Sequence, residues 1–229
     1  MKKILVSLFV LISFSVSAQS TGETNLGTWY MYFGNHRIGD RFSLHSEAQF
    51  RFYQPVSNFN QILLRTGLNY DVHINTIITL GYAYIATDPT FADTTLEDGS
   101  FIENDVKEHR VFEQFSNKSM IGTLHLEHRY RLEQRFITTS INSFTAHRAR
   151  YRILLTYPIS NKWFMSIYDE IFINFQDNLF DQNRLYGALG YRLKNNLNLQ
   201  LGYLKNHFTG RNFDRLQFAI FWSTDFRKK

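Results

Sequence analysis

Cysteine is absent from this 229-residue sequence, which excludes disulfide bridges, thiolate metal ligands and lipid attachment through a cysteine side chain. Proline occurs only three times, so long strands can run without the interruption that proline imposes on a β-sheet. No apolar run of the roughly 20 residues that a membrane helix needs follows the N-terminal segment. Aromatic residues, in contrast, are plentiful, with 22 phenylalanines and 13 tyrosines. This composition favours strands with one apolar and one polar face.

The N-terminal segment has the three parts of a secretory signal peptide. Two lysines follow the initiating methionine, residues 4–16 are apolar, and Val16-Ser17-Ala18 is a small-residue cleavage site. We therefore expect residues 1–18 to be removed and residues 19–229 to form a single exported domain. Loss of the two lysines lowers the formal charge from +5 to +3. An exported chain without a recognised nucleic-acid-binding module is not expected to bind nucleic acid.

Segments in which apolar and polar residues alternate recur along the whole chain. They cover residues 27–35, 41–53, 61–72, 76–87, 106–116, 120–136, 144–157, 163–175, 184–194, 197–207 and 213–226. Most are longer than the mean strand of roughly 5–6 residues in soluble proteins. A tilted strand needs about 9–11 residues to cross the hydrocarbon of a bilayer. Their length and alternation favour strands of a transmembrane barrel.

The connections between these segments alternate between short and long. Short turns are expected at 73–75, 118–119, 158–161 and 195–196, and longer loops at 54–60, 88–105, 137–143, 176–183 and 208–212. This alternation is typical of barrels with short periplasmic turns and longer outer loops. The expected fold is therefore all-β, an antiparallel transmembrane β-barrel of 10–12 strands.

The number of segments is odd, whereas bacterial single-chain barrels have even numbers of strands. If the last strand ends in the periplasm, residues 27–35 would begin on the outer side, which conflicts with a periplasmic N-terminus. Two solutions stay open: residues 27–35 lie outside a ten-stranded barrel, or residues 19–26 contain a twelfth strand.

Charged side chains gather on one face of these strands. In residues 125–136, one phase carries arginine and glutamate, and the other carries leucine, tyrosine and phenylalanine. Because successive strand residues point to opposite sides, apolar faces turned to lipid would place the charges inside the barrel. The expected lumen charge network is Glu108, Arg110, Glu127, Arg129, Arg131, Glu133, Arg135, Arg148, Arg150, Arg152 and Glu170. Its expected role is to fill and lock the barrel.

A two-residue turn at 118–119 would set the register of these charges. It predicts Glu108 opposite Arg129 and Arg110 opposite Glu127, pairs of opposite charge that each contribute roughly 0.2–1 kcal/mol. On the next strand the expected pairs have like charge. These are Arg150 opposite Arg129 and Arg148 opposite Arg131, with Glu133 and Glu170 as the nearest carboxylates.

Four stretches carry a family resemblance when taken in order. They are "RYRLEQRF" (129–136), "RARYR" (148–152), "YDEIFINF" (168–175) and "FDQNRLYGALGYRL" (180–193). In these stretches, and over most of the chain after residue 29, the sequence resembles domain of unknown function 2490. The resemblance implies an outer-membrane β-barrel of the kind that Bacteroidota export. It implies no catalytic residue and no cofactor.

The function expected from these observations is an outer-membrane barrel in contact with lipid, with an Arg/Glu-lined, largely plugged lumen and no enzyme chemistry, cofactor or metal. A narrow anion-selective channel is the alternative within the same fold, because arginine recognises carboxylate and phosphate. A soluble periplasmic barrel that binds an apolar ligand is a further alternative. In that barrel the arginines would coat the exterior.

A membrane-embedded lipid hydrolase or acyltransferase is the alternative from another class. It needs serine, histidine and an orienting group together on the outer wall. His128 and His147 face outward, but the expected register separates them by about 13 Å, with no serine beside either. The acidic loop at 88–105 offers oxygen ligands for calcium, yet its spacing matches no EF-hand. Neither a catalytic nor a metal site is therefore predicted.

Overall fold

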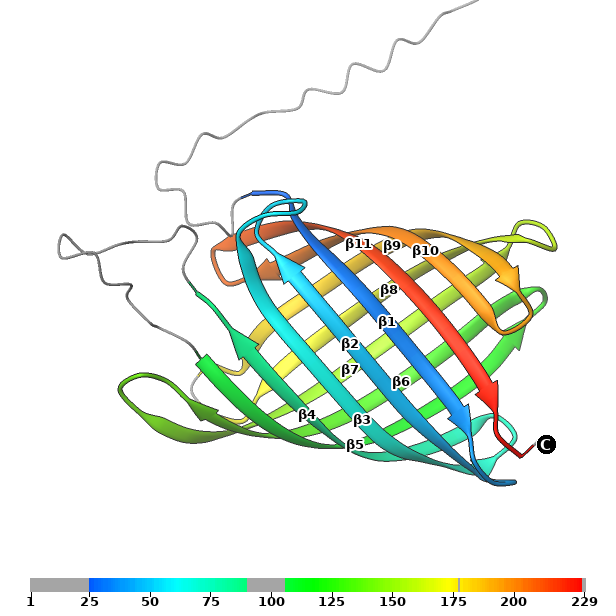
Figure 1. Ribbon diagram of the computed structural model, residues 1–229, viewed down its shortest axis with the longest axis horizontal. Helices are drawn as coiled ribbons and strands as arrows, with labels where there is room; N and C mark the ends of the chain where they lie inside the picture. The colour runs from blue at the N-terminus through cyan, green and yellow to red at the C-terminus, as the bar shows by residue number, and fades with distance from the viewer. Residues whose placement is uncertain (1–24, 90–105, 177, 228–229) are drawn as a thin grey trace, which may run out of the picture.

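The computed structural model describes residues 25–89, 106–176 and 178–227, which form a closed barrel of β-strands (Figure 1). The strands are β1 (Gly27–Arg37), β2 (Phe42–Phe52), β3 (Phe59–His73), β4 (Thr76–Thr87), β5 (Val106–Ile121), β6 (Leu124–Thr138), β7 (Ser143–Pro158), β8 (Trp163–Asn174), β9 (Phe180–Lys194), β10 (Leu197–Phe208) and β11 (Arg211–Asp225). The prediction of an all-β barrel with 10–12 strands is confirmed. Within the described ranges, no helix is long and apolar enough to cross a membrane.

The barrel closes through a parallel seam between its first and last strands. Neighbouring strands pair antiparallel from β1 through β11, but β1 and β11 pair parallel, from Gly27 opposite Arg215 to Arg37 opposite Asp225. Figure 1 shows the two arrowheads side by side and pointing the same way. An up-and-down meander with an odd number of strands has its first and last strands running in the same direction, so it can close only in parallel.

The first solution offered for the odd strand count, a ten-stranded barrel without residues 27–35, is therefore wrong. Residues 27–35 belong to β1, an integral strand of the wall, and the described residues close an 11-stranded barrel without a twelfth strand. The residues before β1 that could have contained one, 19–24, lie outside the described ranges. The start of β1 lies at the end of the barrel opposite to the end of β11, as the parallel pairing requires.

The connections divide between two ends of the barrel. One end, where β11 finishes, carries residues 38–41, 74–75, 122–123, 159–162 and 195–196, and we call it the short-turn end. The opposite, long-loop end carries residues 53–58, 88–105, 139–142, 175–179 and 209–210. Most of the loop at 88–105 lies outside the described residues. The sorting by length is weaker than expected, because the two-residue connection at 209–210 lies at the long-loop end.

Two turns differ from the predicted positions. Residues 118–119 lie inside β5, and the chain reverses instead at 122–123, where Gly122 has a φ of 60°. The expected long loop at 208–212 is a turn at 209–210, where Gly210 has a φ of 76°. Only glycine adopts this left-handed conformation at no steric cost, so each glycine determines where its hairpin reverses.

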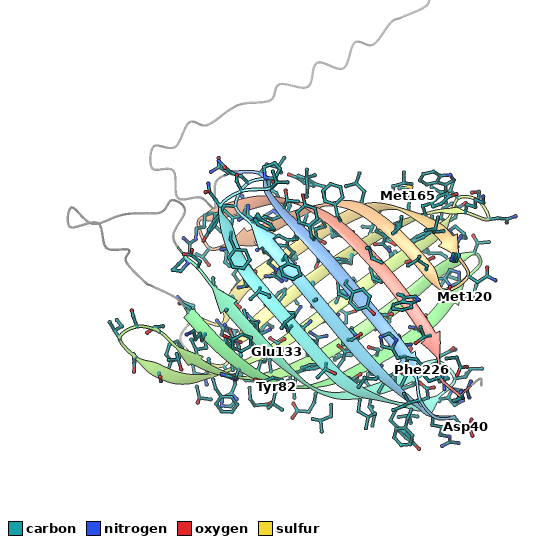
Figure 2. The ribbon with its side chains drawn as sticks, in the orientation of Figure 1. Asp40, Tyr82, Met120, Glu133, Met165 and Phe226 are labelled. Carbon is teal, nitrogen blue, oxygen red and sulfur yellow. The ribbon has the colours of Figure 1, made fainter. Side chains whose placement is uncertain are left out.

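The alternation of the sequence divides the side chains between the two faces of the wall. Most outward residues are apolar, and many are exposed, such as Leu80 at 61% and Leu132 at 49%, whereas the inward residues Glu133 and Arg131 are 1% and 4% exposed. Figure 2 shows side chains covering the outside of the barrel and Glu133 within its outline. The charges lie inside because strand residues alternate by two along β6.

The interior has two chemically different sides. An apolar cluster near the seam contains Trp29, Met31, Tyr186, Leu204 and Ala219, from β1, β9, β10 and β11. The charged residues named from the sequence lie on β5 to β8, across the lumen from the seam. The candidate site is built where these two sides meet.

Candidate functional site

Glu133 of β6 is the central carboxylate of the lumen. Its side chain is 0% exposed, and its oxygens lie 2.8 Å from Arg148 Nη2, 2.8 Å from Arg150 Nη1 and 3.3 Å from Arg110 Nη1. Arg131 lies 3.8 Å away on the same strand. Since four guanidinium groups converge on one buried carboxylate, Glu133 joins strands β5, β6 and β7 through a single side chain.

Glu170 of β8 is a second centre, linked to the first by a shared arginine. Arg150 donates to Glu170 Oε1 from Nε and Nη2, at 3.0 and 2.8 Å, while its Nη1 bonds Glu133. Arg129 Nη2 also donates to Glu170, at 2.7 Å. Arg152 lies opposite Glu170 in the strand register but donates to Glu127 instead, at 2.6 Å.

Two further carboxylates extend the network toward β2, β3 and the long-loop end. Glu108 accepts two hydrogen bonds of 2.9 Å from Arg135 and one of 2.7 Å from Arg110 Nε. Glu47 of β2 lies directly opposite Arg65 of β3 and pairs with it at 2.6 Å. Each of the eleven residues named from the sequence thus forms an ion pair with another member of that set.

The residues named from the sequence omit other charged residues that take part, among them Glu47, Arg65 and Asp181. Glu47 and Arg65 stand on the polar phases of their strands, so the same alternation could have found them. Asp181 accepts a 2.8 Å hydrogen bond from Arg148 and was missed because residues 176–183 were predicted to be a loop. The structure begins β9 at Phe180, so Asp181 falls within a strand.

The predicted register of these charges is wrong on both sides of β6. Glu108 lies opposite Ile137 and Arg110 opposite Arg135, because the hairpin reverses at 122–123 rather than at 118–119. On the other side, Arg129 lies opposite Arg152, Arg131 opposite Arg150, and Glu133 opposite Arg148. Both errors shift the pairing by an even number of residues. An even shift keeps every side chain on its face, so the inward set is unchanged while its partners differ.

Three inward aromatic rings lie against guanidinium groups of the lumen. The ring of Trp29 has Arg51 Cζ at 3.8 Å and Arg184 Cζ at 5.1 Å from its centroid. The rings of Phe112 and Phe172 contact others, with Arg131 Cζ at 4.6 Å and Arg150 Cζ at 4.2 Å respectively. A ring face attracts a cation, so these rings offset part of the repulsion between neighbouring arginines.

The charged and aromatic side chains divide the lumen into two cavities. One, of about 530 Å³, reaches the short-turn end, and the other, of about 320 Å³, lies toward the long-loop end. The residues that line both are Trp29, Gln49, Arg51, Arg65, Arg150 and Arg184. We call these six residues the lumen belt. They mark the level at which side chains interrupt the bore.

The outer wall has a hollow of its own that is larger than either lumen cavity. It encloses about 710 Å³ and is lined mainly by outward apolar residues of β3 to β8, among them Leu80, Tyr130 and Leu132. Glu113 reaches this hollow and accepts a 3.1 Å hydrogen bond from Gln134. Acyl chains of lipid suit such a surface better than a polar ligand does.

A polar cluster that sequence reasoning missed lies on the outer wall at the seam. His36 Nε2 is 2.9 Å from Ser46 Oγ, and His36 Nδ1 is 2.7 Å from Thr224 Oγ1. The Tyr32 hydroxyl lies 3.3 Å from His36 Nε2. A Cβ at Gly34 would collide with Ser46 Oγ, His36 Nε2 and the Tyr32 hydroxyl, so the absence of a side chain there allows these groups to converge.

The two histidines considered from the sequence are farther apart than expected. His128 bonds the Tyr151 hydroxyl at 2.8 Å and lies opposite Ile153, whereas His147 lies opposite Gln134. Six residues along β7 therefore separate them, which is about 20 Å. Sequence spacing could have suggested Tyr32, Gly34 and His36 as one face of a strand. Ser46 joins them through the β1–β2 hairpin, whereas Thr224 joins them only through the seam.

Comparison with known proteins identifies the family of the chain. A family model described as "Protein of unknown function (DUF2490)" matches residues 26–217. No curated protein and no solved structure matches the sequence. The family match extends from the residue before β1 to the middle of β11 and confirms the resemblance seen in the four sequence stretches. The chain belongs to the DUF2490 family of proteins of unknown function.

Proposed function

We propose that this protein resides in the outer membrane as a closed, non-conducting barrel whose Arg/Glu-lined lumen is largely plugged by its own side chains and performs no enzyme chemistry. The observation that carries the proposal is the lumen belt, where arginines and Trp29 stand between the two cavities. Small barrels are filled by side chains in the same way. The ion pairs that join β5 to β8 would hold that side of the wall together.

The outer surface supports the membrane location. Large apolar side chains, among them Leu80, Leu132, Phe218 and Trp222, are 41–61% exposed on the outside of the wall. A contiguous apolar surface around a whole barrel is unfavourable in water and favourable in hydrocarbon. The shortest strands have 11 residues. At roughly 3.3 Å per residue and a tilt of about 40°, such a strand covers about 28 Å, close to the bilayer core.

The orientation proposed from the connections places the short-turn end in the periplasm and the long-loop end outside. β11 then finishes on the periplasmic side, and the chain enters β1 from the outer side. A protease added to whole cells is expected to cleave an epitope inserted at 139–142 and to spare one inserted at 159–162. The reverse pattern would contradict this orientation.

Planar-bilayer recording of the refolded protein tests the closed lumen. We expect no steady conductance, and no release of anionic dye from vesicles that contain the protein. The variant Arg184→Ala removes one side chain of the belt and is expected to widen the bore. Conductance from this variant would show that the assay can detect an open barrel. Reproducible anion-selective steps from the unaltered protein would favour the narrow channel over the plug.

A second candidate function, hydrolysis of lipid esters, is favoured by the cluster at the seam. Ser46 Oγ could attack an ester carbonyl while His36 Nε2 takes its proton, with Thr224 orienting the imidazole. The proton would pass to the departing alcohol, and water would release the acid from Ser46. Strand backbone amides are occupied by the sheet, so the Tyr32 hydroxyl is the nearest described side-chain donor for the developing oxyanion.

Release of fatty acid from phospholipid vesicles tests this second candidate. If the cluster is catalytic, Ser46→Ala should abolish the release, whereas Ser43→Ala, on the same strand but facing the lumen, should leave it unchanged. A protein without hydrolytic activity, or equal activity in the two variants, would remove the candidate.

A further inference from the structure

The 530 Å³ cavity between the lumen belt and the short-turn end has the size of a ligand pocket, since such sites usually measure about 300–1,000 Å³. Residues close to the ends of their strands line its mouth, including Asn35, Lys118 and Ser223. A molecule approaching from the short-turn end therefore meets the cavity before it meets the belt.

One side of the cavity is cationic, and its charge is only partly offset. Its lining contains the arginines Arg51, Arg65, Arg129, Arg131, Arg152 and Arg184 together with Arg150. The carboxylates in the same lining are fewer, namely Glu47, Glu127 and Glu170. Among the described residues, Nε of Arg129, Arg152 and Arg184 and Nη1 of Arg131 are buried without a hydrogen-bond partner. Such donors are costly unless an acceptor reaches them.

The strongest imbalance lies at the inner end of the cavity, around Trp29. Arg51 bonds only amide oxygens there, those of Gln49 and Gln61, and Arg184 has a 3.4 Å contact with Gln182. In the described part of the chain, neither arginine has a carboxylate within 4.0 Å. Two guanidinium groups on one indole ring thus make no direct ion pair with a described carboxylate.

The other side of the cavity carries apolar and aromatic side chains from the belt to the mouth, with Gln200 and Gln217 beside them. Met31 and Tyr186 follow Trp29 in the buried cluster at the seam. Phe33 and Phe221 lie nearer the mouth and stack with their ring centroids 4.8 Å apart. An apolar group that enters along this side would lose contact with water against these rings.

From this arrangement we propose that the cavity binds an amphipathic organic anion, a carboxylate with an aliphatic or aromatic tail. The carboxylate would lie against Arg184 and Arg51 beside Trp29, and the tail would extend past Met31 toward Phe33 and Phe221. The arginine fork matches a carboxylate, and the aromatic side matches the tail. The inference goes beyond the closed barrel, because a pocket that ends at the belt requires no conduction.

The tryptophans of the chain make the binding directly observable. The sequence has three, and Trp163 and Trp222 are exposed on the outer wall, so Trp163→Phe with Trp222→Phe leaves Trp29 as the sole tryptophan, which is excited selectively over tyrosine at long wavelength. In this background, reconstituted in lipid vesicles, we expect 8-bromooctanoate to quench Trp29 fluorescence with a saturable dependence on concentration. The aromatic acid 4-bromobenzoate distinguishes an aromatic from an aliphatic tail preference.

Substitution of Arg184 provides the matched comparison. Arg184→Gln is expected to weaken the apparent affinity for 8-bromooctanoate by about tenfold or more, because it removes a charged hydrogen-bond donor from the carboxylate. Arg184→Lys, which keeps the charge, should retain part of the affinity. Arg192→Gln is the control, since Arg192 lies on the same strand but bonds the backbone oxygens of Ser160 and Asn161.

Three results would overturn the inference. They are quenching that never saturates, equal quenching by uncharged 8-bromooctanol, and an Arg184→Gln variant that binds as well as the unaltered background. Retention of heat-modifiable migration on gels shows that each variant is folded. A conducting barrel that still binds 8-bromooctanoate would refute the closed lumen alone, so the two proposals fail separately.

Discussion

Replacement of Glu133 by glutamine tests whether the buried network stabilises the barrel. The change keeps the size of the side chain and removes its charge, so it alters electrostatics with little change in packing. Glu133 is 0% exposed and contacts Arg110, Arg131, Arg148 and Arg150. Because the side chain cannot reach water, its four partners lose a counter-ion that solvent does not replace.

The magnitude follows from what each arginine retains. Arg150 keeps Glu170, Arg110 keeps Glu108 and Arg148 keeps Asp181, whereas Arg131 loses its carboxylate within 4.0 Å. Removal of one partner from a buried pair costs about 3–5 kcal/mol. Since three of the four arginines keep another carboxylate, we expect a loss near the lower limit, about 3 kcal/mol of unfolding free energy.

Urea-induced unfolding in lipid vesicles, followed by tryptophan fluorescence, measures this loss. The matched control is Glu127→Gln on the same strand, where the carboxylate is 21% exposed and pairs with Arg152 near the short-turn end. Its expected cost is about 1 kcal/mol or less, because solvent partly screens the pair. Equal stability losses in the two variants would refute the reasoning that burial at Glu133 determines the cost.

Two further predictions concern the seam and the outer wall. The native chain has no cysteine, so introduced pairs can be tested by oxidation. Met31 and Ala219 lie directly opposite in the parallel register, and the double variant Met31→Cys/Ala219→Cys should therefore cross-link. The control double variant Met31→Cys/Phe213→Cys should not cross-link. Cross-linking of the second pair alone would show that the seam has another register. Leu132→Arg places a charge on the outer wall and should reduce folding stability in vesicles by about 2–4 kcal/mol if that residue lies near the midplane; an unchanged stability would place it outside the hydrocarbon.

Much of the architecture was predictable because alternation is a local property. The eleven alternating segments correspond to β1–β11, although β5 continues to Ile121 and β9 begins at Phe180, beyond the predicted limits. Local sequence could not set those limits, because the decisive feature was the backbone conformation at Gly122 rather than the polarity of residues 118–119. The choice of face survived this error since the register moved by an even number of residues.

The sequence by itself determined that strands would carry arginine and glutamate on one face and apolar residues on the other, because a strand alternates every two residues. Only the tertiary structure decided which charges meet. Glu133 gathers arginines from β5, β6 and β7, and their partners depend on register and on side-chain reach across strands. The contact of His36 with Thr224 arises only after β1 closes against β11. Closure joins residues from opposite ends of the chain, and no local pattern in the sequence carries that information.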